Sequence, residues 1–206
     1  MERLLRYMVV CSLIVALYGC QDSLKKDKPS NAANSPGRNQ AGDAVKVAIE
    51  ENSQFPKFLV GTWRASNNEG WEFVFEADGK ITSAVIALGR VRIPPGQLTT
   101  VPTITGGKGV FQPGQWTVHY VPSTRELTIK IVLDSLRVEM GDNILEGKST
   151  DVFVGRVAPT GNTWQVEWTS FPQYTGHTRE HPNFDFSGDL VYGTTETLVF
   201  EKIVPQ

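Results

Sequence analysis

The stretch WEFVFEADGKI, residues 71–81, alternates large apolar side chains with mostly acidic ones and then places an Asp-Gly pair before a second apolar run. A period of two is typical of a β-strand with one buried face. The pair Asp78-Gly79 suits the positive-φ positions of a tight hairpin turn. We therefore predict a strand over 71–76, a turn at Asp78-Gly79 and a return strand over 81–88.

The same alternation recurs downstream between turn signals, whereas segments with a helical period are missing from this part of the chain. It predicts further strands around residues 116–120, 127–140, 152–157, 164–168 and 196–203. Stretches rich in Pro, Gly, Asn or Ser separate them and predict turns at 122–125, 141–143 and 159–162. The spacing indicates consecutive antiparallel hairpins.

One of these strands contains a shift in its apolar phase. Leu133 ends one alternating series and Leu136 begins the next, with Asp134-Ser135 between them. A strand exchanges its two faces only by an extra residue. We therefore predict a bulge or a sharp bend at Asp134-Ser135.

These patterns place one all-β domain over residues 55–206, long enough to bury a substantial core. Eight or nine antiparallel strands joined as hairpins either close into a barrel or fold into a sandwich. Closure removes the exposed sheet edges that favour aggregation. We expect an up-and-down barrel, with the sandwich as the alternative.

The first twenty residues have the order of a secretory signal. Arg3 and Arg6 precede an apolar run over 8–17, and the chain then reads Leu17-Tyr18-Gly19-Cys20. Those four positions resemble the lipobox of bacterial lipoproteins. The alternatives are an uncleaved membrane anchor, although a span needs about 20 apolar residues, and a cleaved signal that releases the protein.

The lipoprotein resemblance implies a signal peptide over residues 1–19, cleavage before Cys20 and acylation of its thiol and new amine. Acyl chains would hold the protein on a membrane in the cell envelope. Gln21 follows the cysteine, and in that family the absence of Asp there implies the periplasmic face of the outer membrane.

Residues 20–54 then form the expected tether. Up to about residue 42 they are rich in Pro, Ser, Asn, Gly and charge, and such a segment cannot bury enough surface to offset its chain entropy. A short helix over 43–51, capped by Asp43, and an extended segment remain as alternatives there.

Cysteine usage and charge exclude several classes of protein. Both cysteines, Cys11 and Cys20, lie in the leader, so the folded part has neither a disulfide nor a thiol site. The chain has a net charge of −2, and removal of a leader that carries +1 leaves about −3. A mildly acidic domain without basic clusters offers no footprint for nucleic acid.

The segment Gly61-Thr62-Trp63, placed before the first hairpin, resembles the entry of the lipocalin and fatty-acid-binding proteins of the calycin superfamily. That resemblance implies a barrel closed at one end by Trp63 and open to a small apolar ligand at the other. In the family an arginine of the last strand packs over this tryptophan, whereas this chain has Lys202 in its last strand.

The pair Thr150-Asp151 resembles the second family motif, although Val152 follows where an aromatic residue is expected. Whichever barrel forms, we predict Trp63 to be a core residue whose indole N–H finds a partner.

A ligand inside such a barrel would contact inward residues from several strands. We expect an apolar ligand or lipid, and no cofactor. The predicted contacts are Phe73, Val85, Val118, Ile129, Val166 and Phe200.

Two long segments, 92–114 and 171–193, lack clear strand patterns and carry Pro, Gly or aromatic residues. Long loops often carry function. They are expected either to cover an apolar surface or to fold over the mouth of the barrel. As an alternative function, they would contact a protein partner of the envelope, which makes the domain a non-enzymatic interaction module.

No combination of residues predicts a metal site or catalysis. His177 and His181 are four apart, but Gly176 and Pro182 flank them, so a helix that aligns both imidazoles is not expected. Asp185 and Asp189 would join them only through a specific loop. Ser135, Ser149 and Ser170 lack the context of a catalytic nucleophile. We therefore expect a protein that is not an enzyme.

Overall fold

The structure, a computed structural model, describes residues 44–66, 70–179, 182–185 and 194–204. These residues form one sheet of thirteen strands. Short 3₁₀ turns lie at Glu50–Asn52 and Leu88–Arg90. The strands are β1 (Val45–Ile49), β2 (Gly61–Ala65), β3 (Glu72–Phe75), β4 (Ile81–Ile86), β5 (Val91–Ile93), β6 (Thr99–Pro102), β7 (Lys108–Pro113), β8 (Trp116–Val121), β9 (Glu126–Met140), β10 (Asn143–Val157), β11 (Thr163–His177), β12 (Phe184–Asp185) and β13 (Thr194–Ile203).

The expected all-β class is confirmed, but closure into a barrel is not found. The strand order is β1-β8-β9-β10-β11-β13-β2-β3-β4-β5, with β6 and β7 attached to β9 and β12 attached to β11. Among the described strands, β1 and β5 are the ends of this order and do not pair with each other. Every pairing is antiparallel except that of β1 with β8.

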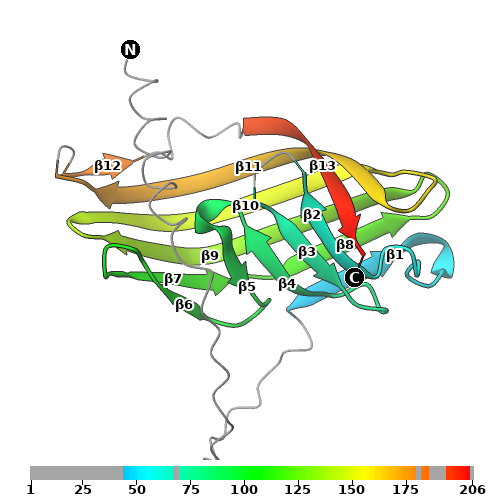
Figure 1. Ribbon diagram of the computed structural model, residues 1–206, viewed down its shortest axis with the longest axis horizontal. Coiled ribbons are helices and arrows are strands. Elements are labelled where there is room, and N and C mark those ends of the chain that lie inside the picture. The colour runs from blue at the N-terminus through cyan, green and yellow to red at the C-terminus, as the bar shows by residue number, and fades with distance from the viewer. Residues whose placement is uncertain (1–43, 67–69, 180–181, 186–193, 205–206) are drawn as a thin grey trace, which may run out of the picture.

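The sheet instead folds over itself, and β2 to β5 lie in front of the long strands β9, β10 and β11 (Figure 1). Phe73 on β3 and Phe153 on β10 meet across this fold, with ring centroids 5.1 Å apart. The ring of Phe200 on β13 packs 5.3 Å from Phe73. All three side chains are fully buried, and each such side chain stabilises the fold by about 1.5–3 kcal/mol.

The hairpin β3–β4 forms as predicted, with one difference in its turn. Gly79 has a φ of 84°, and the backbone N–H of Lys80 donates to Oδ1 of Asp78 at 3.0 Å. Asp78 itself is not among the residues with positive φ. Only the glycine therefore needs the left-handed region, and the aspartate contributes through its side chain.

The predicted bulge in β9 is confirmed. On the side of β10, Leu136 pairs with Gly147 and Leu133 pairs with Ser149, so two residues of β9 oppose one of β10. The two residues at the bulge, Asp134 and Ser135, are both exposed. The bulge lets the apolar residues before and after it face the same core.

The helix considered for residues 43–51 is wrong. Val45–Ile49 is strand β1, which runs parallel to β8, and the N–H of Trp116 donates to the carbonyl of Ala44 at 2.9 Å. Val45 is buried while Val47 and Ile49 are partly buried, so the apolar residues follow a period of two. The sheet therefore begins before residue 55, inside the segment predicted to be a tether.

The two long segments are also more regular than expected. Residues 92–114 contain the end of β5 and the hairpin β6–β7. The hydroxyl of Thr103 in this hairpin donates a 2.7 Å hydrogen bond to the carbonyl of Glu139 on β9. Residues 171–177 continue β11. Residues 180–181 and 186–193 lie outside the described part of the chain.

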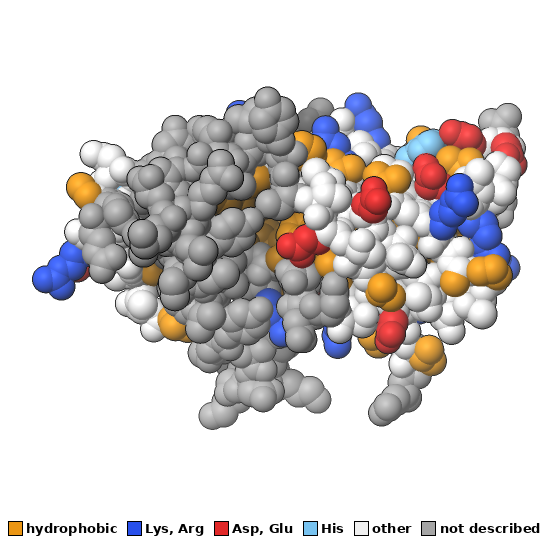
Figure 2. All heavy atoms as spheres, turned by 90° about the horizontal axis from the view of Figure 1, so that it is seen from above, with side chains coloured by type: hydrophobic (Ala, Val, Ile, Leu, Met, Phe, Trp, Pro, Cys, Tyr) orange, Lys and Arg blue, Asp and Glu red, His pale blue; other side chains and the backbone are white. Residues whose placement is uncertain are grey.

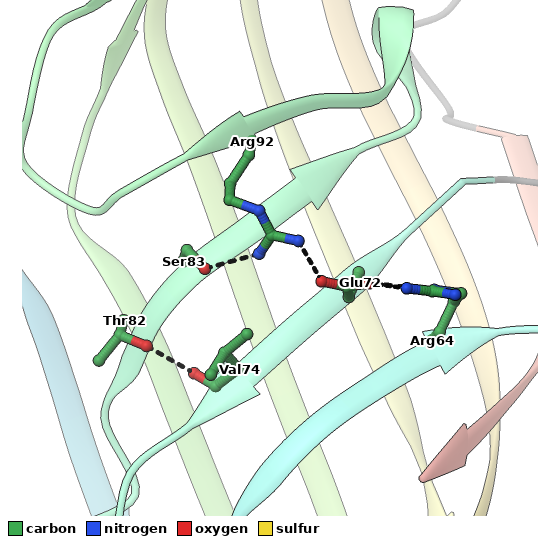
Figure 3. Close-up of polar contacts among 6 residues, drawn as sticks. All are labelled: Arg64, Glu72, Val74, Thr82, Ser83 and Arg92. Carbon is green, nitrogen blue, oxygen red and sulfur yellow. Dashed lines mark hydrogen bonds and ion pairs between the residues drawn. The ribbon is translucent and has the colours of Figure 1, made fainter. Parts of the chain in front are cut away.

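On the outer face of the sheet, Glu72 lies between two arginines (Figure 3). Arg64 on β2 donates to Oε2 of Glu72, with Nη2 2.8 Å away, and Arg92 on β5 donates to Oε1. Burial raises the pKa of Glu72, but the hydrogen bonds and charges of Arg92 and Arg64 outweigh burial and hold that pKa below its usual value. This cluster joins β2, β3 and β5 on the outside.

Charges of both signs are interspersed on the described part of the face shown in Figure 2. Apolar side chains are exposed near the middle of that view, beside residues that are not described. Among the described residues no helix has the length and apolar character needed to cross a membrane.

Candidate functional site

Five polar or amphipathic side chains gather on the inner face of β10 and β11. We call Ser149, Asp151, Trp168, Ser170 and Tyr174 the Asp151 cluster. Alternate residues of a strand point to the same face, so Ser149 and Asp151 share one face of β10. The register places Asp151 opposite Ser170. The cluster is thus built from two neighbouring strands by their alternation.

Hydrogen bonds converge on the carboxyl group of Asp151. Nε1 of Trp168 donates to Oδ1 at 3.0 Å, and Oγ of Ser149 donates to Oδ2 at 3.2 Å. The hydroxyl of Ser170 forms a third hydrogen bond to this group. Tyr174 hydrogen-bonds to Ser149. The carboxyl group therefore accepts bonds from three side chains.

Asp151 is buried without a cation beside it. It is 5% exposed, and none of the ion pairs found among the described residues includes it. Burial raises the pKa of Asp151, although the hydrogen bonds from Ser170, Trp168 and Ser149 oppose this effect. Burial and the nearby charge of Asp151 raise the pKa of Tyr174 as well. A buried carboxyl without a counter-ion is costly when ionised.

An aromatic wall adjoins the cluster. It consists of Trp71, Phe153 and Trp168. The ring of Trp71 meets Phe153 edge-on at 4.9 Å and Trp168 at 5.8 Å, and Phe153 stacks on Trp168 at 6.2 Å. Nε1 of Trp71 is buried with no hydrogen-bond partner in the described structure. A donor left without an acceptor in the interior costs about 1–3 kcal/mol.

Gly147 makes room for the cluster. It pairs with Tyr174 across the two strands and has a φ of 152°. A Cβ at this position would clash with the carbonyl oxygen of Gln173 and would lie 2.9 Å from Cδ1 of Tyr174. Only glycine therefore allows the tyrosine ring to pack close to β10.

The cluster reaches solvent on the side of β11. Trp168, Ser170 and Tyr174 are half-buried, whereas Ser149 and Asp151 are buried. This arrangement combines a partly accessible rim, a buried acceptor and an apolar wall. Binding sites for small molecules commonly have this combination.

Five of the six predicted ligand contacts lie in the hydrophobic core, namely Phe73, Val118, Ile129, Val166 and Phe200. Phe73 is in contact with the rings of Trp164 and Phe200, with centroids 6.3 and 5.3 Å away. Around Phe73, the inner faces of the folded sheet therefore pack directly on each other. The candidate site lies further along β10 and β11 than the sequence indicated.

The sixth predicted contact, Val85, is on the wrong face. Val85 pairs with Glu72, whereas Ala84 pairs with Phe73. The cause is an irregularity in β4, where Val74 pairs with Ser83 and Phe75 with Ile81, so one residue of β4 is extra. That shift turns Val85 to the outer face.

Trp63 has the structural role predicted for it. It is 1% exposed, and its Nε1 donates to the carbonyl of Leu59 at 2.8 Å. Lys202 pairs with Trp63 across β13 and β2, and its Nζ donates to the carbonyl of Phe58 at 2.7 Å. The lysine thus neighbours the tryptophan.

The remaining predicted sites are only partly within the described chain. Cys20 and the leader lie outside it, as do His181 and Asp189, and the side chain of Asp185 is not described. Within the described ranges, no three His, Cys, Asp or Glu side chains lie close enough together to hold a metal ion.

A scan against protein-family models and searches of curated proteins and of solved structures found no match to this chain.

The sequence analysis did not identify Asp151 as a site residue. The signal was nevertheless present. The alternation of β10, extended backwards from Phe153, places Asp151 and Ser149 on the inner face. An acidic residue in the inward phase of a strand is unusual, because charged residues are seldom fully buried unless paired.

Proposed function

We propose that this chain is a lipid-anchored protein of the cell envelope whose folded sheet binds a small, largely apolar ligand without catalysing a reaction. The observation that carries the proposal is the Asp151 cluster, a buried hydrogen-bonding group beside the wall of Trp71, Phe153 and Trp168. An apolar wall with a few convergent polar groups is the usual make-up of a ligand site.

Two buried polar groups of this site support binding rather than a purely structural role. In the described structure, Asp151 has no cation beside it and Trp71 has a buried N–H without an acceptor. Native proteins leave few buried polar groups unpaired, so an unpaired group calls for an explanation such as an ion, a water molecule or a ligand. A ligand in contact with both groups would supply it.

The relation to lipocalins belongs to the same proposal. It is supported by Gly61-Thr62-Trp63 at the start of β2 and by the packing of Lys202 beside Trp63. The proposed site is not the apolar interior that the sequence indicated, because aromatic rings fill the interior around Phe73.

Ligand binding is tested with the full chain in mild detergent and the fluorescent probe N-phenyl-1-naphthylamine. Ser170→Leu places a large side chain in the cluster and should weaken probe binding by about tenfold or more. Thr169→Leu is the matched control, since this neighbour lies on the opposite face of β11. Equal probe binding by both variants and the wild type would contradict the site.

Anchoring is tested separately by Cys20→Ala. The variant should accumulate as an unprocessed or detergent-free soluble form, because acyl chains on Cys20 hold the mature protein on the membrane. Membrane fractions washed at alkaline pH report the result. A variant that is still cleaved after residue 19 and still sediments with membranes would refute the lipid anchor.

The hairpin β6–β7 favours a second candidate function, docking of an envelope protein. β6 pairs only with β7 among the described strands, and Leu98 and Ile104 beside it are 61% and 53% exposed. A free strand edge with apolar neighbours can take a strand from another chain. A photocrosslinker at Thr100 should then capture one defined protein in cells, whereas one at Thr128 on β9, a strand paired on both sides, should not.

A further inference from the structure

We propose that the ligand of the Asp151 cluster carries a protonated amine, with the Asp151 carboxylate as its counter-ion and the neighbouring aromatic rings around it. This inference rests on the proposed binding function and adds the chemical class of the ligand. It is carried by the contacts of Asp151 and by the composition of the elements around it.

The hydrogen bonds of Asp151 suit an ionised acceptor. A carboxylate offers about four acceptor positions, and side chains of Ser149, Trp168 and Ser170 occupy three of them. All three bonds can be donated to the carboxylate at once, whereas a protonated carboxyl must use one oxygen as a donor. One acceptor position remains for a further donor.

The charge that an ionised Asp151 needs does not come from the described protein. β9 places Ile131 opposite Asp151, and β11 places Ser170 there. Tyr174, which is neutral, is the titratable side chain of the described structure that interacts with this carboxyl. An ionised carboxyl buried without a counter-ion costs several kcal/mol, and a cation brought by the ligand offsets that cost.

The aromatic wall favours a cation over a neutral donor. Trp71, Phe153 and Trp168 form one connected group of rings, and Trp168 also donates to the carboxyl. An ammonium group is attracted by aromatic faces, most strongly by tryptophan. A neutral hydroxyl would form a hydrogen bond with Asp151 but would gain nothing comparable from the rings.

The unpartnered N–H of Trp71 is a second, independent indication of a ligand. It is a donor, and Trp71 is 2% exposed. An oxygen on the ligand near the amine would accept this hydrogen. Amino alcohols and acylated amines with an apolar body have both groups.

The test compares 2-phenylethylamine with 2-phenylethanol, which differ only in the group offered to Asp151. Calorimetric titration of the full chain in mild detergent at about pH 8 should show that the amine binds about tenfold more tightly or better. Asp151→Asn should remove this preference, so that the amine and the alcohol bind within about twofold of each other. Asp142→Asn, in the exposed turn between β9 and β10, is the control and should keep the preference.

The outcomes separate this inference from the proposed function. If amine and alcohol bind equally to the wild type, the inference is wrong and the binding function stands. If neither binds but the fluorescent probe does, the amine class is again wrong. If the probe also fails to bind, the proposed function itself is wrong.

A pH series on the wild type gives a further readout that does not depend on the variants folding. The amine affinity should fall as the pH is lowered through the titration of Asp151, while the alcohol affinity stays constant. A pH-independent preference would overturn the inference. Circular dichroism verifies that each variant keeps the sheet.

Discussion

Nε1 of Trp168 lies 3.0 Å from Oδ1 of Asp151, across the paired strands β10 and β11. This one hydrogen bond joins the aromatic wall to the buried carboxyl. The tryptophan orients the acid, and the acid satisfies the indole N–H that burial would otherwise leave unpaired.

Asp151→Asn should change the pH dependence of stability. Burial raises the pKa of Asp151 in the folded state, so its contribution is fully present below the unfolded pKa of about 3.9 and is lost as the pH rises through the folded pKa. The free energy of unfolding of the variant, relative to wild type, should therefore rise with pH from about pH 4 upward. Urea unfolding across the pH range measures it.

The control for this series is Asp142→Asn, because Asp142 is exposed in the β9–β10 turn. Its free energy of unfolding should stay within about 0.5 kcal/mol of the wild-type value, as is usual for an exposed substitution. If the difference in the free energy of unfolding between Asp151→Asn and the wild type does not vary with pH, burial does not raise the pKa of this carboxyl in the fold.

Glu72→Gln should lower stability at neutral pH by about 1–2 kcal/mol, because it removes charge-assisted hydrogen bonds from two half-exposed arginines. The pKa of Glu72 is lowered in the fold, so its contribution is present above the unfolded pKa and is lost as the pH falls through the folded pKa. Urea unfolding at about pH 7 and about pH 3 should show a difference that shrinks in acid.

Glu76→Gln is the matched control for Glu72. Glu76 is exposed just beyond the end of β3, and such substitutions usually change stability by less than about 0.5 kcal/mol. An equal loss for both variants would mean that the outer-face cluster does not hold β2, β3 and β5 together.

Trp63→Phe should cost roughly 2–4 kcal/mol, because it leaves a small cavity and removes the donor from the carbonyl of Leu59. Trp71→Phe is the comparison, since Trp71 is equally buried but its N–H has no partner in the described structure. It should cost only roughly 1–2 kcal/mol. Thermal unfolding of both variants measures the difference, and a reversed order would contradict the assigned hydrogen bond.

Gly147→Ala should destabilise the sheet by roughly 2 kcal/mol or more, because the new Cβ meets the backbone of Gln173 and the ring of Tyr174. Gly141→Ala has a positive φ of 61° but open space around it, so it should cost only about 1 kcal/mol. Chemical unfolding compares the two. Similar losses would show that strain at φ, rather than the close approach of Tyr174, limits Gly147.

Local features of the sheet could be predicted from neighbouring residues. The hairpin around Asp78-Gly79 and the bulge at Asp134-Ser135 depend on side chains and φ values within a few positions. The strand pattern of β8 and β9 follows from apolar residues at a period of two. Such features form because each residue must face either the core or solvent.

The face of Val85 could not be predicted in this way. The extra residue near Thr82 lies in a run where polar and apolar residues do not mark the phase clearly, since Ser83 is half-buried and Ala84 is small. The pairing with β3, rather than the sequence of β4, selects which residues point inward. The packing of aromatic rings around Phe73 could not be predicted either, because these rings come from β10, β11 and β13, which lie far from β3 in the sequence.

Strand β1 illustrates a third limit. Val45, Val47 and Ile49 fit a strand, but a short apolar segment after a polar tether also fits a helix. The parallel pairing with β8, about seventy residues downstream, decides between them. Long-range pairing overrides weak local preference.

The sequence by itself determined that this chain forms β-strands, where most of its hairpins turn and where one strand changes phase, because alternation and turn residues act locally. Only the tertiary structure decided that the sheet stays open and folds over itself, that Val85 faces outward and that Asp151 lies buried between Ser149, Trp168 and Ser170. Those outcomes depend on which distant strands pair and pack. The residues next to each strand in the sequence do not indicate which distant strand it will pack against.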